Sequence, residues 1–216
     1  MHKNEKINNF WKYIKEYIGT KGTIVVPTFT YSATNNEIFD PLHSSSKIGQ
    51  FSEDFRKLDF TKRNSHSIFS VSSYGYYQNE IMNISLNTCF GKKSIFDFLN
   101  EINAKLVCLG CSYNELTFSH YVEECFGVKY RYHKKFNGKY IENNVIKNIE
   151  ISYFARKLDY NRSTKLNLDK LTKILFSQNL FIDSPFGRVS GYSCFAKDFF
   201  KYSFSSLNVD EHFLIN

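Results

Sequence analysis

The sequence lacks the features that would tie it to a membrane. No apolar stretch approaches the roughly 20 residues that a helix needs to cross a bilayer. The first residues, MHKNEKINNFWKY, contain no apolar core of the kind found in a secretory signal peptide. These absences exclude a helical membrane protein and favour a cytoplasmic protein without a membrane partner.

Metal-binding motifs are also missing. The pattern HExxH of many metalloproteases does not occur, and the CxxC formed by Cys108 and Cys111 has no second pair at zinc spacing. The five cysteines are an odd number, so free thiols are expected in a reducing compartment. We therefore expect no metal, and we favour packing of Cys108 in the core over a redox role for the pair.

Basic residues are numerous but not clustered. The formal net charge is +7, which indicates an anionic partner such as nucleic acid, a membrane surface or a phosphorylated small molecule. The lysines are scattered, however, and no run of five or more basic residues occurs. A small anionic molecule is therefore favoured over nucleic acid.

The chain has no internal repeat, no low-complexity segment and no linker. Apolar periodicity predicts helices, and β-branched runs predict strands, in alternation along the chain. Asn137-Gly138 is a strong turn signal, so we expect a hairpin there. The pattern predicts one domain, residues 1–216, of mixed α/β (α+β) class with a central mixed β-sheet flanked by helices. Helices are expected at 5–18, 49–58, 95–102, 114–126 and 168–175, and strands at 23–27, 67–75 and 104–110.

The segment ELTFSHYVEE, residues 115–124, brings together side chains suited to proton transfer. Residues three and four apart share a helix face, which groups Thr117, His120 and Glu124 and places Glu123 at the edge. A histidine accepts a proton near neutral pH, a carboxylate orients it, and a hydroxyl can donate to a developing oxyanion. Judged by spacing alone, an ordinary solvated helix face is the more common explanation.

Three further segments could bind an anion. RNSHSIFSVSSYG (63–75) places an arginine and a histidine among serines, PTFTYS (27–32) places hydroxyls at the end of a strand, and CFGKKS (89–94) places lysines before a helix. Each is also typical of an ordinary polar loop. The candidate residues are Thr28, Arg63, His66, Ser70, Gly91, Lys92 and Ser94.

The order of these segments resembles that of the aminoglycoside 3-N-acetyltransferase family, the antibiotic acetyltransferases that lack the GNAT fold. The resemblance covers most of residues 5–140 and, more weakly, the rest. Its most specific element is TxxHxxE, met by Thr117, His120 and Glu123. The matching segments are GTIVVPTFT (22–30), FDPLHSSSKIGQFSEDFRKL (39–58), RNSHSIFSVSSYG (63–75), CFGKKSIFDFL (89–99), LVCLGCSYNELTFSHYVEE (106–124), YRYHKKFNGK (130–139) and GRVSGYSCFAKDFF (187–200).

The resemblance implies acetyl-CoA as donor and an amine on a sugar as acceptor. It makes His120 the general base, Glu123 its orienting partner and Thr117 a neighbour of the thioester carbonyl. Direct attack of the amine would need no covalent intermediate, so no cysteine is required. The implied coenzyme-binding residues are Thr28, Ser70, Gly91, Lys92 and Ser94, and the implied substrate-binding residues are Arg63, His66, Asp40 and Glu124.

The chain departs from the family pattern in several places. Ser67 replaces the usual proline, Asn64 the usual serine, and Ser45 stands where proline is frequent. We also expect the front to be short, because family members carry a leading strand and a serine-bearing turn before the first helix. An inactive relic that only binds ligand is therefore an alternative to the enzyme.

The charge bears on the choice of acceptor. A protein of net charge +7 repels polycationic aminoglycosides at long range and attracts CoA and nucleotide-linked amino sugars. An N-acyltransferase of a nucleotide-linked amino sugar in surface glycan synthesis is therefore the alternative function. Screening beyond about 8 Å lets local carboxylates form an aminoglycoside site all the same. The candidates are Asp40, Glu53, Asp54, Glu123 and Glu124, and a homodimer is left open.

Overall fold

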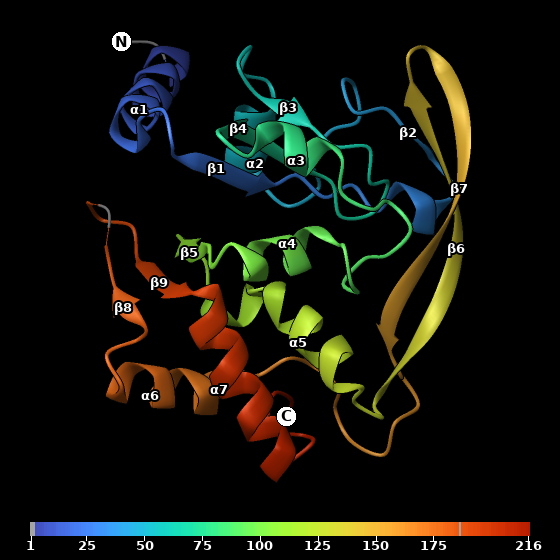
Figure 1. Ribbon diagram of the computed structural model, residues 1–216, viewed down its shortest axis with the longest axis vertical. Helices are drawn as coiled ribbons and strands as arrows, with labels where there is room; N and C mark the ends of the chain where they lie inside the picture. Colours follow the sequence, from blue (N-terminus) through green and yellow to red (C-terminus); the bar gives the residue numbers. More distant parts are fainter. Residues whose placement is uncertain (1–2, 186) are drawn as a thin grey trace. The chain divides into compact units, whose positions relative to one another are not determined.

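The computed structural model describes residues 3–185 and 187–216 of the chain (Figure 1). The α-helices are α1 (Lys3–Ile18), α2 (Gln50–Arg56), α3 (Gln78–Met82), α4 (Ile95–Glu101), α5 (Phe118–Phe126), α6 (Asp169–Ser177) and α7 (Ala196–Val209). Two short 3-10 helices are η1 (Ser32–Asn35) and η2 (Tyr113–Glu115). The strands are β1 (Thr23–Pro27), β2 (Ile38–Phe39), β3 (Lys62–Arg63), β4 (Val71–Gly75), β5 (Lys105–Leu109), β6 (Arg131–Glu142), β7 (Val145–Arg156), β8 (Ile182–Asp183) and β9 (Gly191–Phe195).

The mixed α/β class is confirmed. The strands are divided among three sheets rather than gathered in one, with the orders β1-β4-β3, β2-β6-β7 and β5-β9-β8. β2 pairs with β6 in parallel, whereas β4 pairs with β1 and β3 in the antiparallel sense. The chain forms two compact units, the first up to Asn87 with Lys135–Ile151 and the second Thr88–Lys134 with Ser152–Asn216. One domain over residues 1–216 stays a prediction.

The first unit contains an apolar cluster beside the antiparallel sheet β1-β4-β3. α1 contributes Trp11, whose ring centroid lies 4.5 Å from that of Phe55 in α2. Val26 of β1 completes the buried group. The amphipathic pattern of the first helix and the β-branched run of β1 thus bury the same cluster, and removal of this apolar surface from water stabilises the unit.

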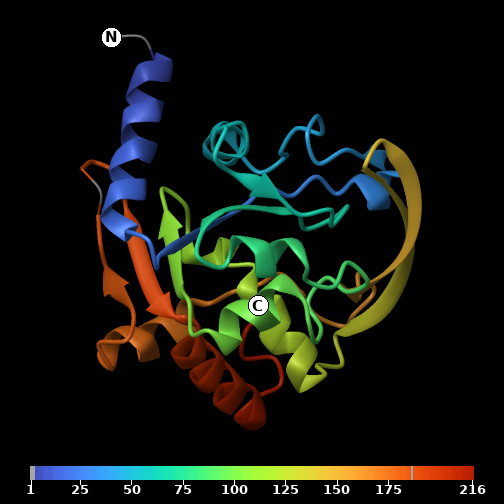
Figure 2. The ribbon, with the colours of Figure 1, turned by 45° about the horizontal axis from the view of Figure 1, so that its top comes forward.

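The two longest strands, β6 and β7, run side by side as a ribbon (Figure 2). The turn predicted at Asn137-Gly138 is wrong, because both residues lie inside β6. The chain reverses instead at Asn143 and Asn144, whose φ angles are 51° and 62°. A tight hairpin turn needs positive φ, which asparagine tolerates better than most residues.

Gly138 is required for close packing rather than for a turn. A Cβ atom at this position would lie 2.7 Å from the Ser67 hydroxyl and 3.2 Å from the Cβ of Ala33. Only glycine lets β6 approach these residues so closely.

In the second unit, α5 packs against α7 and α4. The contact with α7 consists of aromatic side chains contributed by both helices. The ring centroids are 5.8 Å apart for Phe118 and Phe199, 5.6 Å for Tyr121 and Phe200, and 5.4 Å for Phe126 and Phe204. The predicted apolar face of α5 is thereby confirmed, except that Cys125 is exposed.

Two predicted boundaries are wrong for local reasons. The strand expected at 67–75 begins only at Val71, because Nδ1 of His66 accepts hydrogen bonds from the amides of Ile68 and Phe69 and holds a turn. The helix expected at 114–126 begins at Phe118, preceded by η2 and by Thr117 at the N-cap position. Within the described chain, every helix is too short or too polar to span a membrane.

Candidate active site

The polar face of α5 meets the start of β6 because the helix ends in a sharp turn. Gly127 follows the helix with a φ of 78°, and its amide donates to the carbonyl of Glu123 at 2.9 Å. A glycine in this left-handed conformation is a common way to end a helix. The reversal brings Tyr130 and Arg131 back toward the helix that they follow.

Four side chains then converge within the second unit. Nδ1 of His120 lies 2.7 Å from Oε2 of Glu123, and the Tyr130 hydroxyl donates to Oε1 of Glu123 at 2.8 Å. Nε of Arg131 lies 2.8 Å from Oε2 of Glu123, and its Nη2 lies 2.9 Å from Nδ1 of His120. The predicted pair of His120 and Glu123 is therefore in direct contact, and two further residues join it.

The carboxylate at the centre of this group is closed off from water. The Glu123 side chain is 0% exposed and that of Arg131 is 4% exposed. Burial opposes ionisation of Glu123, but the hydrogen bond and charge of His120, the charge of Arg131 and the Tyr130 hydroxyl together lower its pKa. Glu123 is therefore ionised at neutral pH.

The imidazole is held differently on its two sides. The His120 side chain is 21% exposed, and the ring of Phe90 packs against it with centroids 5.3 Å apart. Nδ1 of the His120 ring contacts Glu123 and Arg131, whereas Nε2 has no polar partner among the described residues. Burial and the charge of Arg131 lower the pKa of His120, whereas the hydrogen bond and charge of Glu123 raise it. His120 is thus neutral at neutral pH, the state in which Nε2 can accept a proton.

Thr117 occupies the N-cap position of α5, three residues before His120. Its hydroxyl makes one long contact, 3.5 Å to the carbonyl of Glu115, and does not cap the helix. So weak a contact is easily exchanged for a ligand. The placement of Thr117 beside a thioester carbonyl stays a prediction.

Glu124 lies next to the loop that holds Gly91. A Cβ atom at Gly91 would lie 2.6 Å from Oε1 of Glu124 and 2.8 Å from the Thr88 hydroxyl, so a side chain there would displace both groups. Oε2 of Glu124 is buried without a hydrogen-bond partner in the described chain. Burial raises the pKa of Glu124 to about 7, against the opposing charge of Arg131. The structure thus joins Gly91 and Glu124, which the sequence analysis assigned to different ligands.

The remaining residues of the lysine loop are arranged around the start of α4. The Ser94 hydroxyl is the N-cap and accepts from the amide of Asp97 at 3.2 Å. The amide of Lys93 donates to Asp97 at 2.7 Å, and Lys92 is exposed. Ser94 therefore already serves the helix, and the coenzyme role of Lys92 and Ser94 stays a prediction.

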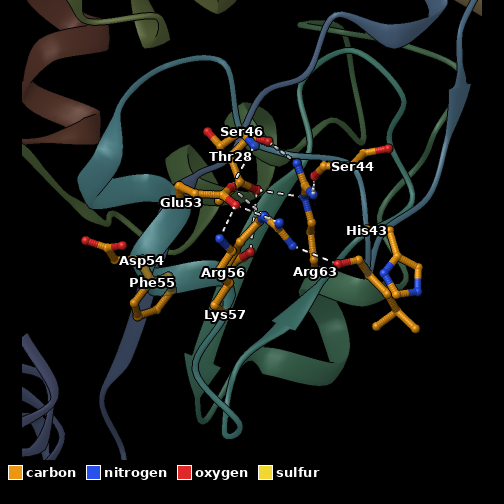
Figure 3. A network of polar contacts seen from close by, with 12 residues as sticks. Thr28, His43, Ser44, Ser46, Glu53, Asp54, Phe55, Arg56, Lys57 and Arg63 are labelled. Carbon is orange, nitrogen blue, oxygen red and sulfur yellow. Dashed lines mark hydrogen bonds and ion pairs between the residues drawn. The ribbon is translucent and has the colours of Figure 1, made fainter. Parts of the chain in front are cut away.

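In the first unit, Arg63 is surrounded by protein acceptors (Figure 3). Its Nε lies 3.1 Å from the Thr28 hydroxyl and 3.2 Å from that of Ser70, its Nη1 donates to the carbonyl of Ser44, and its Nη2 donates to that of Thr28. The guanidinium also lies over the ring of Phe39, 4.9 Å from its centroid. Burial and the charge of Arg56 lower the pKa of Arg63 to about 10, so it remains charged. These contacts favour a role in holding the loop through Ser44, and a substrate contact by Arg63 stays a prediction.

The other candidates of the first unit also have internal partners. Thr28 and Ser70 are fully buried, and each hydroxyl donates to the backbone carbonyl of the other, at 3.1 Å and 2.8 Å. His66 is buried with Nδ1 engaged as described, and Oδ1 of Asp40 accepts from the amides of Leu42 and His43. Their predicted ligand contacts stay predictions. The hydroxyl of Thr28, directly after β1, is explained by its hydrogen bond to the backbone carbonyl of Ser70.

Two residues of the cluster were not assigned a role from the sequence. Tyr130 and Arg131 follow α5 by a few residues, but no motif ties a tyrosine-arginine pair to a distant carboxylate. The only signal is Gly127, which predicts a helix end and a reversal. The described cysteines carry free thiols, as expected, and no group of three or more histidine, cysteine or acidic side chains in the described chain is arranged to hold a metal.

Comparison with known proteins gives a family match and several matches in fold. A family model described as aminoglycoside 3-N-acetyltransferase matches residues 3–207. A search of curated proteins found no match to the chain.

Several solved structures are similar over nearly the whole chain. The aminoglycoside acetyltransferase AAC(3)-IVa, as apoenzyme, superposes with a TM-score of 0.78 at 18% identity, covering 97% of this chain and 78% of its own. AAC-IIIb, as a binary complex with CoASH, gives 0.77 at 16% identity, covering 94% and 83%. AAC-VIa bound to sisomicin gives 0.80 at 14% identity, covering 95% and 85%. At identities this low, the likeness shows a shared fold.

Proposed function

Because the chain belongs to the aminoglycoside 3-N-acetyltransferase family, we propose that it transfers an acetyl group from acetyl-CoA to an amino group of an aminoglycoside or a related amino sugar. Members of this family are acyltransferases. The donor is supported by the likeness in fold to AAC-IIIb, which was solved with CoASH. The acceptor class is supported by the likeness to AAC-VIa, which was solved with sisomicin.

The observation that carries the proposal is the contact between His120 and Glu123. A neutral imidazole 2.7 Å from a buried, ionised carboxylate is a suitable general base, because the carboxylate fixes the ring and stabilises the imidazolium that forms. With Nδ1 turned toward Glu123, the lone pair on Nε2 is available to a substrate. General-base assistance of this kind contributes about a hundredfold to ten-thousandfold in rate.

The chemistry follows from these positions. The acceptor nitrogen attacks the acetyl carbonyl carbon, and Nε2 of His120 takes the proton that the nitrogen loses as the C–N bond forms. The C–S bond then breaks, and the proton passes to the departing thiolate, which leaves as free CoA. To the Thr117 hydroxyl, three residues before His120, we assign a hydrogen bond to the carbonyl oxygen as it becomes negative. No cysteine takes part.

Glu124 is the acidic residue of α5 that could attract an amine. It lies four residues after His120, on the same face of the helix, and one of its oxygens is buried without a hydrogen-bond partner among the described residues. A buried carboxylate oxygen without a partner is costly, and a hydrogen bond from an ammonium group of the acceptor would remove that cost. We assign it the recognition of a second amino group on the sugar.

A nucleotide-linked amino sugar is the alternative acceptor, favoured by the net charge of +7. The test is release of CoA thiol from acetyl-CoA, measured in parallel with kanamycin-type drugs and with nucleotide-linked amino sugars. Turnover with either class supports an N-acetyltransferase and identifies the acceptor. Turnover with neither, despite binding of acetyl-CoA in calorimetry, would establish a ligand-binding relic.

The variant that tests the proposed base is His120→Asn, which keeps a polar side chain but removes the imidazole. We expect its kcat to fall by about a hundredfold or more while acetyl-CoA binding is retained. Full turnover by this variant would overturn the role of His120.

A further inference from the structure

Two opposite charges compete for one atom of the active-site histidine. Nδ1 of His120 lies 2.7 Å from Oε2 of Glu123 and 2.9 Å from Nη2 of Arg131. A hydrogen on Nδ1 can donate to the carboxylate, but it then opposes the N–H of the guanidinium. A lone pair on Nδ1 can accept from Arg131, but it then opposes the carboxylate. The position of one proton therefore depends on both neighbours.

Arg131 is held where it is by contacts of its own. Its Nη1 donates to the carbonyl of Phe154 at 3.1 Å, and its Nε lies 2.8 Å from Glu123. Its side chain is 4% exposed, so its charge is poorly screened by water. The guanidinium is thus a fixed positive charge beside the imidazole.

The net charge of the cluster decides which state is favoured. With Glu123 ionised, Arg131 charged and His120 neutral, the three side chains sum to zero. Protonation of His120 would leave a surplus positive charge in a nearly closed site, whereas removal of the arginine charge would leave a surplus negative one. A buried surplus charge of either sign is costly. Without the arginine charge, a proton on His120 would cancel the negative charge of Glu123.

We propose that Arg131 is a positioning residue that keeps His120 unprotonated at rest by neutralising Glu123. Its place in catalysis rests on the proposed acetyltransferase function, whereas its effect on the imidazole does not. The guanidinium also makes the imidazolium short-lived, because its fixed positive charge, 2.9 Å from Nδ1, repels the positive charge that the ring gains on protonation. The proton is therefore passed on readily to the departing thiolate.

The other groups around the imidazole are consistent with this assignment. Arg156, at the end of β7, also disfavours the charged ring, but it is exposed and its charge is better screened. Tyr130 is a neutral donor to Glu123, Tyr153 packs against Phe90, and Glu124 interacts with Arg131. Arg131 is therefore the cation whose removal changes the cluster most.

The test is an NMR titration of the His120 ring in variants that separate charge from hydrogen bonding. Arg131→Gln keeps a donor near Nδ1 but removes the charge, and Arg131→Lys keeps the charge but removes the planar fork. Tyr130→Phe is the control, because it removes a donor to the same carboxylate without changing any charge. The resonance is assigned among the six histidines by its loss in His120→Asn.

We expect Arg131→Gln to shift the titration midpoint of His120 upward, with Arg131→Lys and Tyr130→Phe close to the unmodified protein. An unchanged midpoint in Arg131→Gln, or an equal rise in Arg131→Lys, would overturn the proposal. If Arg131→Gln does not fold, Arg131→Lys alone decides, since an unchanged midpoint supports the role of charge and a rise refutes it.

Activity provides a second readout. In Arg131→Gln, the ratio of kcat/KM at about pH 8 to that at about pH 6 should rise about tenfold, because a unit charge within 4–6 Å shifts an acid equilibrium by about that factor or more. A merely structural loss would lower kcat/KM equally at both values. If no variant and no unmodified protein shows turnover, the proposed function fails, but the titration still tests Arg131.

Discussion

Glu123 carries a full charge in a place that water does not reach. Its carboxylate has three side-chain partners, His120, Tyr130 and Arg131, which are near it in sequence, so a short stretch of chain holds the charge. Buried ion pairs of this kind seldom stabilise a fold more than apolar side chains of the same volume would. The arrangement therefore fits the proton transfer proposed for His120 better than it fits a role in stability.

Glu53 offers a pH test at the residue scale. Burial alone would raise its pKa, but hydrogen bonds from Arg56, Lys57 and the Ser46 amide lower the pKa of Glu53 to about 2 (Figure 3). Because this value lies below that of the unfolded chain, Glu53 contributes stability above about pH 4.5 that is lost as the pH falls toward 2.

In urea unfolding at about pH 5 and about pH 3, we expect the loss of unfolding free energy on acidification to be smaller in Glu53→Gln than in the unmodified protein. Asp54→Asn, at the next position, is the control and should leave that loss unchanged. An identical loss in both variants would contradict the assignment.

The cysteine pair gives a negative prediction. Burial and the neighbouring Cys111 raise the pKa of Cys108 to about 12, so its thiol is not ionised at neutral pH. Since the thiolate is the reactive form, a redox role is not supported. We expect Cys108→Ala combined with Cys111→Ser to retain most of the acetyl transfer measured by amide formation. Abolished turnover in a folded double variant would instead favour a thiol mechanism.

At the scale of elements, the site depends on one helix and the reversal behind it. α5 is fixed on one side by its aromatic contacts with α7, and its end at Gly127 sends the chain back into β6. His120 and Glu123 therefore lie on a helix, and Arg131 is the first residue of strand β6. A site built on regular elements keeps its distances better than one built on loops.

The packing of β6 at Gly138 can be tested with a double-mutant cycle. Gly138→Ala should cost about 1–3 kcal/mol in unfolding free energy, because the new methyl group overlaps the Ser67 hydroxyl. Ser67→Ala removes that hydroxyl, which has no hydrogen-bond partner in the described chain, and should recover much of the loss in the double variant. Additive effects in chemical denaturation would show that the two positions do not touch.

At the scale of the whole molecule, charge is the property that reaches beyond a single contact. A net charge of +7 attracts a polyphosphate coenzyme at distances where no specific contact exists. The same charge opposes the approach of a polycationic drug. We therefore expect salt to weaken the attraction of the proposed coenzyme and to reduce the repulsion of a polycationic acceptor.

We expect KM for acetyl-CoA to rise with added salt, because the screening length falls from about 30 Å at 0.01 M to about 8 Å near physiological ionic strength. Acetyl-pantetheine, which carries the same thioester without the nucleotide, is the control and should show little change. Equal salt dependence for both donors would exclude long-range attraction as the cause.

Much of the architecture and the central pair of the site follow from the sequence. Local periodicity and residues a few positions apart determine the first helix, the strand that ends at Pro27, the strand that contains Cys108 and the helix with His120 and Glu123. Spacing along a helix determines which side chains share a face. The predicted contact between His120 and Glu123 is therefore a property of the chain itself.

The tertiary structure decided what those side chains face. Three features depend on partners that no local sequence pattern specifies. They are the hydrogen bonds from Arg63 to backbone carbonyls, the position of the turn at Asn143-Asn144 and the contact of Arg131 with His120. An arginine has the same sequence signature whether it meets a phosphate, a carbonyl or a carboxylate. Only the packing of separate segments fixes its acceptor, and with it the charge that controls the proton on the histidine.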